Sequence, residues 1–394
     1  MIKKKKISII GGAGHIGLPL AVLLFDVGFE INIVDKDKKN ISLIKKGIPP
    51  FYEDGLKQKL KKIYNNKNFK VSSNLKTIFD SNFIFICIGT PVTSNLQPDL
   101  SNFFSLLTSL KKNIRRNSNL IIRSSIAPGI FKKIFNLFNK DKKIPNLFYC
   151  PERVLQGKSL KEINEIPQII SSYNLKSLNI VDRLFRKICK KTIKCKPEEA
   201  EMIKIMSNAF RYINFSISNE FYRICDENNL NFEKIRRMMR MDYSRASGLA
   251  SPGFVGGPCL MKDTMQLNYY DKRNMNLLQH AFQINEKLPN YIAKKIKNLK
   301  IHKKKVFILG KSFKPNNDDL RGSLTLNLMK VLEKMKIKHN VYDPHVKKIN
   351  KLELKKLIKD SNIFVLATGH NEFKKIKIPS NKYLIDMSGF YFKF

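Results

Sequence analysis

The feature that most constrains the fold is a glycine-rich turn between two short apolar segments. Residues 6–10 form a strand-like run, Gly12-Ala13-Gly14-His15-Ile16-Gly17 follows, and an apolar helix is expected from about Leu18 to Val27. A second strand-like run, Glu30 to Val34, ends at Asp35, 18 residues after Gly17. The order strand, glycine turn, helix, strand, acidic residue predicts a dinucleotide-binding βαβ unit.

The residue types of this turn suggest which dinucleotide binds. Glycines at 12, 14 and 17 allow a tight turn and a close approach of the pyrophosphate to the helix N-terminus, and His15 and Ile16 belong to the same turn. Asp35 would accept hydrogen bonds from the ribose hydroxyls, which favours NAD over its 2'-phosphorylated relative.

The βαβ rhythm continues with strand-like runs at Phe83 to Ile88 and Leu120 to Arg123. Polar turns that contain Thr90 and Ser125 follow them, and ligands of such sheets lie outside the carboxyl ends of the strands. We therefore expect both side chains to touch cofactor or substrate, with ordinary turn chemistry as the alternative. Glu152, after the strand-like Asn146 to Cys150, is a candidate acid/base or water-positioning residue.

A long helix is predicted from Pro197 to about Glu227, roughly 45 Å in length. Helices of this length commonly bridge two domains and pack against a symmetry mate. Lys204, Asn208 and Arg211 lie at i, i+4 and i+7, which makes either a functional stripe or a solvated face.

A cysteine loop, residues 251–263, combines three glycines, two prolines, Cys259, Lys262 and Asp263. A thiol near a cation and a helix N-terminus is in an environment that stabilises thiolate. A structural cysteine in a Gly/Pro loop is the alternative. Beyond it, a second α/β unit is expected from Val306, and its first turn, residues 310–321, carries groups that could hold a phosphate.

Composition excludes several classes of protein. The net charge of +42 arises from lysines spread over all 394 residues, alongside abundant Asn, Ile and Phe, so A/T-rich codon usage explains it better than a nucleic-acid site. The six cysteines lack C-x-x-C spacing and the six histidines lack metal-site pairing, so no metal is expected. No apolar run is long enough to span a bilayer, and the chain is expected to be cytoplasmic.

The chain resembles the UDP-glucose/GDP-mannose dehydrogenase family nearly end to end. The motifs that carry the resemblance are Gly12-x-Gly14-x-x-Gly17, Gly89-Thr90-Pro91, Ser124-Ser125, Pro151-Glu152-Arg153, Glu201-Met202-Ile203-Lys204 with Asn208 and Asn219-Glu220, the cysteine loop, and Phe313-Lys314-Pro315 with Asp318-Asp319-x-Arg321.

The resemblance implies an α/β fold with two Rossmann-like doubly wound domains, joined by a long-helix dimerisation domain. We expect an NAD-binding domain over 1–195, a central domain with the catalytic cysteine over 196–295, and a UDP-sugar-binding domain over 296–394. The implied protein is a homodimer that associates through the long helix.

The implied reaction is the NAD-dependent oxidation of the primary alcohol of a UDP-sugar to a uronate, for polysaccharide precursor synthesis. Cys259 would capture the aldehyde as a thiohemiacetal and then carry a thioester. Lys204 and Asn208 would stabilise the oxyanion. Asp263, Glu152 and Ser125 would manage the proton and the hydrolytic water; family members usually have threonine where Ser125 stands.

Only a few residues indicate which UDP-sugar is the substrate. Arg211, Asn214 and Arg245 resemble the branch that oxidises UDP-N-acetylhexosamines, whereas Lys262-Asp263 is similar to the UDP-glucose enzymes. We expect UDP-N-acetylmannosamine or UDP-N-acetylglucosamine, with UDP-glucose as the alternative and a non-catalytic nucleotide-sugar or nucleic-acid binder as a remote one. The further residues expected to bind substrate or cofactor are Arg153, Phe254, Gly256, Gly257 and Lys314 for the UDP-sugar, and Arg321 for NAD.

Overall fold

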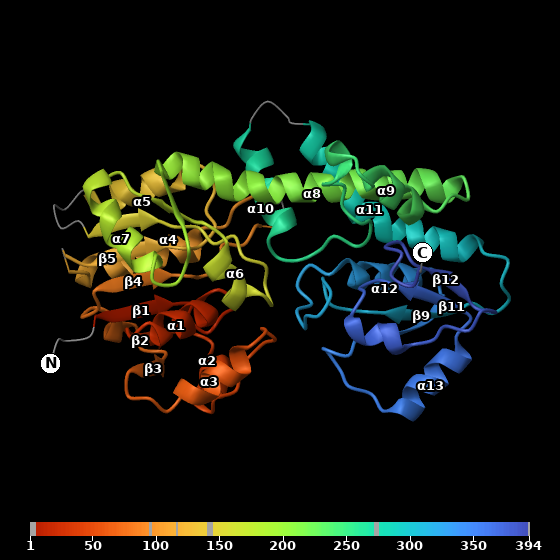
Figure 1. Cartoon of the computed structure of the whole chain (residues 1–394), viewed down its shortest axis with the longest axis horizontal. Helices are drawn as coiled ribbons and strands as arrows, with labels where there is room; N and C mark the ends of the chain where they lie inside the picture. The colour runs from red at the N-terminus through yellow and green to blue at the C-terminus, as the bar shows by residue number, and fades with distance from the viewer. Residues whose placement is uncertain (1–4, 94–96, 116, 140–144, 272–275, 393–394) are drawn as a thin grey trace. The chain divides into compact units, whose positions relative to one another are not determined.

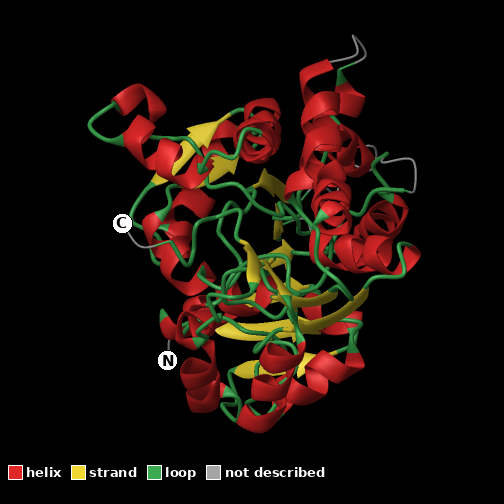
Figure 2. Ribbon diagram, turned by 90° about the vertical axis from the view of Figure 1, so that its right-hand side faces the viewer, coloured by secondary structure: helices red, strands yellow, loops and turns green. Residues whose placement is uncertain are grey.

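The computed structural model describes residues 5–93, 97–115, 117–139, 145–271 and 276–392. The chain divides into two compact units, Met1–Ser207 and Asn208–Phe394 (Figure 1). Each unit contains a β-sheet with helices packed on it (Figure 2). The fold class predicted from the sequence, α/β with two Rossmann-like sheets and a long central helix, is confirmed.

The first unit contains an eight-stranded sheet in the order β3-β2-β1-β4-β5-β6-β7-β8. Neighbouring strands are parallel except for the β6–β7 pair, which is antiparallel. The strands are β1 (Lys6–Ile10), β2 (Glu30–Val34), β3 (Phe69–Ser72), β4 (Phe83–Ile86), β5 (Asn119–Ile122), β6 (Asn146–Tyr149), β7 (Gln168–Ser171) and β8 (Thr192–Cys195). Because the chain winds from β1 to β2 and β3 and then returns to β4 on the other side of β1, the glycine turn lies where the winding reverses.

Helices cover both faces of this sheet because successive strand residues point to opposite faces. Phe83 and Phe85 belong to one core with α1 and α7, whereas Ile84 and Ile86 belong to the other with α4 and α5. The helices are α1 (Gly17–Asp26), α2 (Lys38–Lys45), α3 (Leu56–Ile63), α4 (Ser101–Asn113), α5 (Ile130–Asn139), α6 (Ser159–Glu165) and α7 (Leu178–Phe185).

The second unit contains a four-stranded parallel sheet in the order β10-β9-β11-β12. Its strands are β9 (Lys305–Leu309), β10 (Lys338–Tyr342), β11 (Ile363–Leu366) and β12 (Tyr383–Ile385). Its helices are α9 (Phe232–Arg240), α10 (Leu260–Tyr270), α11 (Asn276–Asn298), α12 (Leu324–Lys334) and α13 (Lys351–Asp360). Val306 and Ile308 pack with α11 and α12, while Phe307 and Leu309 form a separate core on the opposite face.

The long helix α8 runs from Pro197 to Glu227, the range predicted from the sequence. Pro197 occupies the first helical position, where proline costs no hydrogen bond, and Glu198 and Glu199 favour the helix N-terminus electrostatically. Among the residues that the structure describes, no helix is long and apolar enough to cross a membrane.

Most predicted strands match the observed ones within two residues. The strands expected at Phe83 to Ile88 and Leu120 to Arg123 are β4 (Phe83–Ile86) and β5 (Asn119–Ile122). The apolar sequence continues past the end of β4 because Cys87 and Ile88 still pack on the cores although they already lie beyond the strand.

Candidate active site

The glycine turn of the first unit is shaped by close backbone contacts. A Cβ atom on Gly17 would lie 2.5 Å from the Gly11 carbonyl oxygen, and one on Gly12 would lie 2.7 Å from the Ile9 carbonyl oxygen. Both distances are shorter than a real Cβ contact, so these positions require glycine. A Cβ atom on Gly14 would meet only the Gly11 oxygen, at an ordinary 3.5 Å. The turn therefore does not need Gly14 for its own packing, which fits a position kept small for a ligand.

Asp35 lies beside this turn, at the carboxyl end of β2. Its carboxylate accepts hydrogen bonds from the backbone N–H of Ala13 and of Asp37, both at 3.0 Å. Ile16 is the N-cap of α1, and the ring of His15 packs on Phe51 with 3.9 Å between centroids. The structure thus brings together the glycines, the helix N-terminus and the acid that the sequence predicted for NAD, and these residues fit that cofactor.

Thr90 and Ser125 follow adjacent strands and contact each other. The Thr90 hydroxyl donates a hydrogen bond to the Ser125 carbonyl oxygen, and Ser124 Oγ donates to the Ile88 carbonyl oxygen at 2.7 Å. Thr90 is buried and Ser125 is half-buried. The two turns are therefore tied together at the carboxyl ends of β4 and β5.

Glu152 forms a buried ion pair with Arg123, the last residue of the strand predicted from Leu120. The Glu152 carboxylate also accepts hydrogen bonds from the backbone N–H of Arg153 at 2.8 Å and of Val154 at 3.2 Å. Arg123 donates to Gln168 Oε1 at 2.7 Å, and burial lowers its pKa from the usual value. These contacts hold the Glu152 carboxyl group in place.

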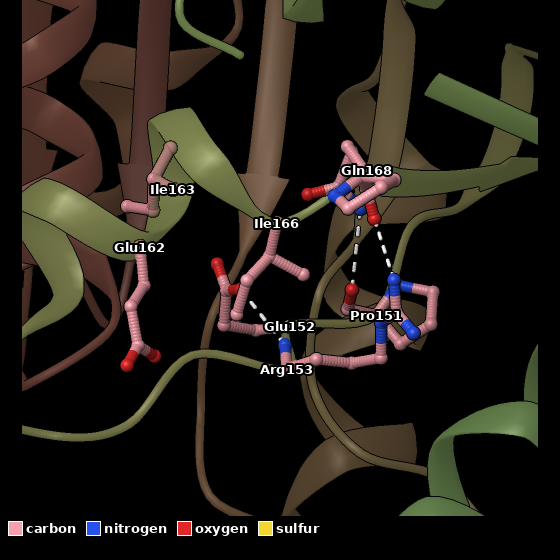
Figure 3. Close-up of a pocket in the computed structure, with 8 residues that line it drawn as sticks. Pro151, Glu152, Arg153, Glu162, Ile163, Ile166 and Gln168 are labelled. Atoms are coloured by element: carbon pink, nitrogen blue, oxygen red, sulfur yellow. Dashed lines mark hydrogen bonds between the residues drawn. The ribbon is translucent and has the colours of Figure 1, made fainter. Parts of the chain in front are cut away.

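Arg153 points away from Glu152 and donates to the Pro167 carbonyl oxygen at 2.6 Å. Both residues line a small pocket with Pro151, Glu162 and Gln168 (Figure 3).

Lys204 is buried on α8, one turn beyond Glu201. The Glu201 carboxylate accepts hydrogen bonds from the backbone N–H of Gly129 and Phe131, each at 2.7 Å, at the start of α5. Burial raises the pKa of Glu201 to about 7, although these N–H groups act in the opposite direction. Glu201 therefore anchors α8 to the segment that follows Ser125.

In the second unit, Cys259 is exposed and occupies the N-cap position of α10. Burial raises the pKa of the Cys87 and Cys150 thiols of the first unit to about 12. Those two thiols are unsuited to nucleophilic chemistry near neutral pH. Exposure and a helix N-terminus distinguish Cys259 from them, as the sequence predicted.

One helical turn after Cys259, Asp263 lies fully buried. Asn208 Nδ2 donates to its carboxylate at 2.6 Å, and Lys262 Nζ lies 3.2 Å from its other oxygen. The backbone N–H of Asp263 donates to the Cys259 carbonyl oxygen at 2.9 Å. Hydrogen bonds thus join Asp263 to both Asn208 and Cys259.

The cysteine loop packs closely on the turn after β9. A Cβ atom on Gly256 would lie 2.3 Å from the Gly322 carbonyl oxygen, and one on Gly257 would lie 2.6 Å from the Phe313 ring. The backbone N–H of Gly257 donates to the Gly322 oxygen at 3.1 Å. The two glycines are therefore needed for this packing, whether or not they also touch substrate.

Arg321 and Lys314 lie on the same turn. Asp319 binds the Arg321 guanidinium at 2.6–3.0 Å. That hydrogen bond raises the pKa of Arg321, and the nearby Cys259 adds to the effect. Lys314 Nζ lies 5.6 Å from the centroid of the Phe313 ring.

The residues expected to read the sugar occupy different environments. Arg211 is exposed on α8, and Arg245 is exposed with its guanidinium 4.9 Å from the centroid of the Tyr243 ring. Asn214 donates to the Gly248 carbonyl oxygen at 2.6 Å and accepts from the Ala250 N–H at 3.2 Å. Phe254 is half-buried against the core of the second sheet.

A further polar cluster lies at the carboxyl ends of β10 and β11. His345, His370 and Glu372 offer donor atoms within 4.8 Å of one another, which is a possible metal geometry. His370 Nδ1, however, accepts the Asn316 N–H at 2.9 Å, and its Nε2 lies 2.9 Å from an Asp343 oxygen. Both ring nitrogens therefore already have partners within the protein.

Sequence reasoning did not assign roles to Arg123, Glu201 or Asn219. A charged residue that closes an otherwise apolar strand run could have indicated Arg123. Glu201 and Asn219 each lie at helical spacing from the predicted stripe on α8, three residues before Lys204 and eleven after Asn208.

Comparison with known proteins identifies relatives of the whole chain. Models of the UDP-glucose/GDP-mannose dehydrogenase family match residues 5–189 (NAD binding domain), 198–287 (central domain) and 307–393 (UDP binding domain). A UDP-N-acetyl-D-mannosamine dehydrogenase of Methanococcus vannielii is 33% identical over 387 residues, which cover 95% of this chain and 88% of the relative. A UDP-glucose 6-dehydrogenase of Bacillus subtilis is 26% identical over 397 residues, which cover 95% of this chain and 90% of the relative.

Solved structures agree with these matches. The structure of a UDP-D-ManNAc dehydrogenase of Pyrococcus horikoshii superimposes with a TM-score of 0.87 and 26% identity, and covers 98% of this chain and 96% of that one. With its NAD-binding, central and UDP-binding domains, the chain belongs to the UDP-glucose/GDP-mannose dehydrogenase family and is an NAD-dependent UDP-sugar dehydrogenase.

Proposed function

We propose that the protein oxidises the primary alcohol of UDP-N-acetyl-D-mannosamine to the uronate, as a precursor of cell-surface polysaccharide. The observation that carries the reaction class is the exposed Cys259 at the N-cap of α10, next to the buried Asn208–Asp263 pair. The choice of sugar is supported by relatives that are UDP-N-acetyl-D-mannosamine dehydrogenases, such as those of Methanococcus vannielii and Pyrococcus horikoshii.

In this proposal Cys259 provides a covalent anchor for the aldehyde. Its thiolate adds to the aldehyde carbon, and the thiohemiacetal keeps the reactive intermediate bound until a thioester forms and water hydrolyses it. Bound NAD supplies the hydride acceptor for each of the two oxidations. Cysteine suits this chemistry because it is a good nucleophile for the first step and a good leaving group for the last.

The surrounding residues take the roles that their chemistry allows. Lys204 contributes positive charge and Asn208 a hydrogen bond to the developing oxyanion. Asp263 and Glu152 handle the proton and the attacking water, and Ser125 positions that water. We propose further that Glu152 acts mainly by positioning, because Arg123 and the backbone N–H groups of Arg153 and Val154 hold its carboxyl group in place.

We propose that residues of the first unit, together with Arg321, bind NAD. In the proposal Gly12, Gly14, His15, Ile16 and Gly17 hold the pyrophosphate end of NAD, and Asp35 holds the adenosine ribose. Thr90 and Arg321 complete the NAD site.

The UDP-sugar is assigned to a wider set of side chains and backbone. Arg211 and Arg245 would bind the acetamido group, for which a guanidinium is a good donor. The remaining predicted contacts are Arg153, Asn214, Phe254, Gly256, Gly257 and Lys314. UDP-glucose is the second candidate substrate, which the Lys262-Asp263 pair after the cysteine and the Bacillus subtilis relative support.

We also propose a homodimer that associates through α8. Phe210, Ile217, Phe221 and Ile224 recur at helical spacing and are all exposed; Phe210 is 69% exposed. Burial of such a stripe against a second copy would remove this apolar surface from water. Light scattering of Phe210→Asp and Ile217→Asp should show monomers where the wild type shows dimers.

The domain limits 1–195, 196–295 and 296–394 and a cytoplasmic location stay predictions. The three family matches, at 5–189, 198–287 and 307–393, support the division.

The experiment that tests the function is a panel of UDP-sugars scored for NADH. UDP-N-acetylmannosamine, UDP-N-acetylglucosamine and UDP-glucose are each incubated with NAD, and the NADH formed per sugar is counted. We expect two NADH per UDP-N-acetylmannosamine. Cys259→Ser should stall before the uronate or accumulate an ester adduct that mass spectrometry detects. Full activity of this variant, or one NADH per sugar, would contradict the covalent route.

A further inference from the structure

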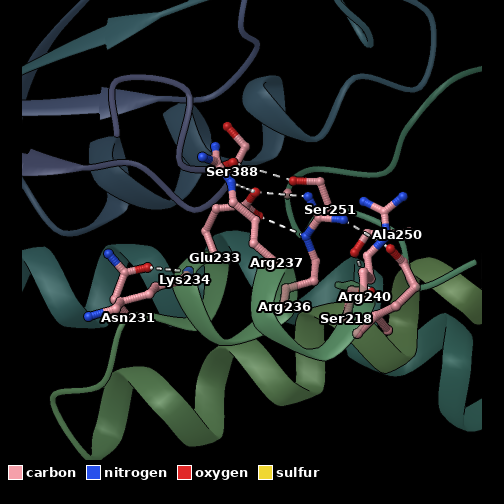
Figure 4. Close-up of polar contacts among 12 residues, drawn as sticks. Ser218, Asn231, Glu233, Lys234, Arg236, Arg237, Arg240, Ala250, Ser251 and Ser388 are labelled. Atoms are coloured by element: carbon pink, nitrogen blue, oxygen red, sulfur yellow. Dashed lines mark hydrogen bonds and ion pairs between the residues drawn. The ribbon is translucent and has the colours of Figure 1, made fainter. Parts of the chain in front are cut away.

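Side chains of α8 form hydrogen bonds with the backbone of the segment before Cys259 at Gly248, Ala250 and Gly253. Residues 248–258 form no helix or strand. Asn214 bonds the backbone of Gly248 and Ala250, and Ser218 Oγ donates to the Ala250 carbonyl oxygen at 2.8 Å. Figure 4 shows Ser218 close to Ala250, with Arg236 and Arg240 of α9 nearby. Side chains of α8 thus form the backbone hydrogen bonds that a neighbouring strand would form with this segment in a sheet.

Asn219 makes the most complete of these contacts. Its Oδ1 accepts the Gly253 N–H at 2.8 Å, and its Nδ2 donates to the Gly253 carbonyl oxygen at 3.1 Å. A hydrogen-bonded pair in an antiparallel sheet exchanges the same two bonds. Asn219 is 0% exposed, so both hydrogen bonds to Gly253 come from a buried side chain, and loss of its amide removes both of them.

A second asparagine fixes the orientation of this amide. Asn219 Nδ2 also donates to Asn285 Oδ1 at 2.9 Å, and Asn285 Nδ2 donates to the Tyr212 carbonyl oxygen at 3.2 Å. Asn285 is fully buried as well. Because Asn285 Nδ2 donates to the Tyr212 carbonyl oxygen of α8, Asn285 presents its Oδ1 to Asn219. The Asn219 amide therefore has one satisfied orientation, the one that matches Gly253.

Asn219 and Asn208 lie on the same face of α8 and hold the two sides of the cysteine. They are eleven residues apart, which is about three helical turns. Asn219 binds Gly253, six residues before Cys259, and Asn208 binds Asp263, four residues after it. Gly253 has φ of +148°, a conformation that favours glycine, and Asn219 bonds both of its backbone polar groups.

We propose that Asn219, oriented by Asn285, is a positioning residue that sets the place of the Cys259 thiol. The inference rests on the proposed function, because it assumes that Cys259 is the nucleophile. Since reacting atoms must be aligned within a fraction of an ångström, release of the loop at Gly253 lowers the rate of the covalent step more than it lowers substrate or cofactor binding.

The test compares Asn219→Ala and Asn219→Asp with a control, Asn228→Ala. Asn228 is exposed just after the end of α8, and its side chain donates to the carbonyl oxygen of Ile224 at 2.8 Å. For each variant, kcat and KM are measured with NAD and UDP-N-acetylmannosamine, together with the melting temperature. We expect Asn219→Ala to lower kcat about 100-fold, with KM for NAD within about threefold of wild type.

Asn219→Asp adds a readout that a general loss of stability would not give. A neutral carboxyl group can accept from the Gly253 N–H and donate to its oxygen, whereas a carboxylate can only accept. Because burial at this enclosed position raises the pKa of a carboxyl group, the kcat of Asn219→Asp, divided by that of Asn219→Ala, should rise several-fold as the pH falls from 8 to 6. A constant ratio would overturn the proposal.

Three other results would also overturn it. These are a kcat of Asn219→Ala within threefold of wild type, an equal loss in Asn228→Ala, or a KM for NAD that rises in parallel with the loss of kcat. Cys259→Ser is assayed beside them to keep the two proposals apart. An active Cys259→Ser rejects the covalent route itself, whereas an inactive Cys259→Ser with an unimpaired Asn219→Ala rejects only the positioning role.

Discussion

The turn after β1 and the turn after β9 are built on the same plan. Gly11 and Gly310 both have positive φ, +75° and +93°. Each donates its N–H to the last residue of the neighbouring strand, Gly11 to Val34 at 2.9 Å and Gly310 to Tyr342 at 2.8 Å. In both turns the residue after that strand is an aspartate, Asp35 or Asp343, whose carboxylate accepts backbone N–H groups of the turn.

The two aspartates differ in what else surrounds them. Asp35 is half-buried, and its bonds go to two backbone N–H groups. Asp343 is buried and binds the N–H of Lys311, Ser312 and His345 as well as the ring of His370. His370 and these N–H groups hold the pKa of Asp343 well below its usual range, although burial alone would raise it.

The lengths of the turns explain the difference. Six residues, 11–16, separate β1 from α1, whereas fourteen, 310–323, separate β9 from α12. The longer turn needs internal support, which Asp343 and His370 supply, and it carries Gly322 and Phe313 against the cysteine loop. The two aspartates follow equivalent strands, but Asp35 is therefore available to a ligand, whereas Asp343 stabilises the fold.

The largest expected effect is on stability. Asp343→Ala leaves buried N–H groups and His370 without their acceptor and should lower the free energy of unfolding by about 3–5 kcal/mol. Asp35→Ala removes two bonds at a half-exposed site and should cost about 1 kcal/mol. Urea titration of both variants measures the difference, with the exposed Asp360→Ala as the control. Equal losses at the two aspartates would remove the distinction between them.

The next effect concerns the choice of cofactor. A carboxylate beside the ribose repels a 2'-phosphate, so the wild type should use NAD about 10²-fold better than NADP in kcat/KM, a difference of about 3 kcal/mol. Asp35→Ala should bring this ratio close to one, while Asp26→Ala, at the far end of α1, should leave it unchanged. Equal use of NAD and NADP by the wild type would show that Asp35 does not face the ribose.

A smaller effect should distinguish Gly14, which we expect to face the cofactor, from Gly12, which the packing of the turn requires. Gly14→Ala should raise KM for NAD about tenfold, or about 1.4 kcal/mol, with little change in unfolding free energy, because its Cβ atom finds ordinary space. Gly12→Ala forces a Cβ atom to 2.7 Å from the Ile9 oxygen and should destabilise the unit instead. Paired kinetics and unfolding curves distinguish the two; an unchanged KM in Gly14→Ala would mean that the cofactor does not approach there.

The sequence predicted the limits of helices and strands well where a local sequence pattern determines them. The limits of β1, β2 and α8 agree with the structure because apolar periodicity, glycines and Pro197 mark them locally. The sequence also predicted roles for Cys259, Asn208 and Asp263, which remain predictions, and hydrogen bonds join Asp263 to each of the other two.

What the sequence could not show are contacts between distant residues. The pairs Glu152–Arg123 and Asn219–Gly253 join residues 29 and 34 positions apart, and no local pattern encodes such a meeting. Asn214 was expected to read the substrate, and its amide is bonded to Gly248 and Ala250. For the same reason the sequence could not show the contacts of Asp343 with Lys311, Ser312 and His370.

The smallest predicted effect is a pH dependence that belongs to Asp343. Its pKa is lowered in the folded state, so the stability it contributes is fully present above its unfolded pKa of about 3.9 and is lost as the pH falls toward the folded pKa. Between pH 7 and pH 3 this loss is about 1 kcal/mol, because the unfolded carboxylate becomes largely protonated while the folded one stays charged. Asp343→Asn cannot titrate, so its unfolding free energy should fall less steeply than that of the wild type over this range, whereas Asp360→Asn should follow the wild type. Parallel curves for wild type and Asp343→Asn would show that Asp343 is not held as a charged group, and the contrast with Asp35 would then rest on burial alone.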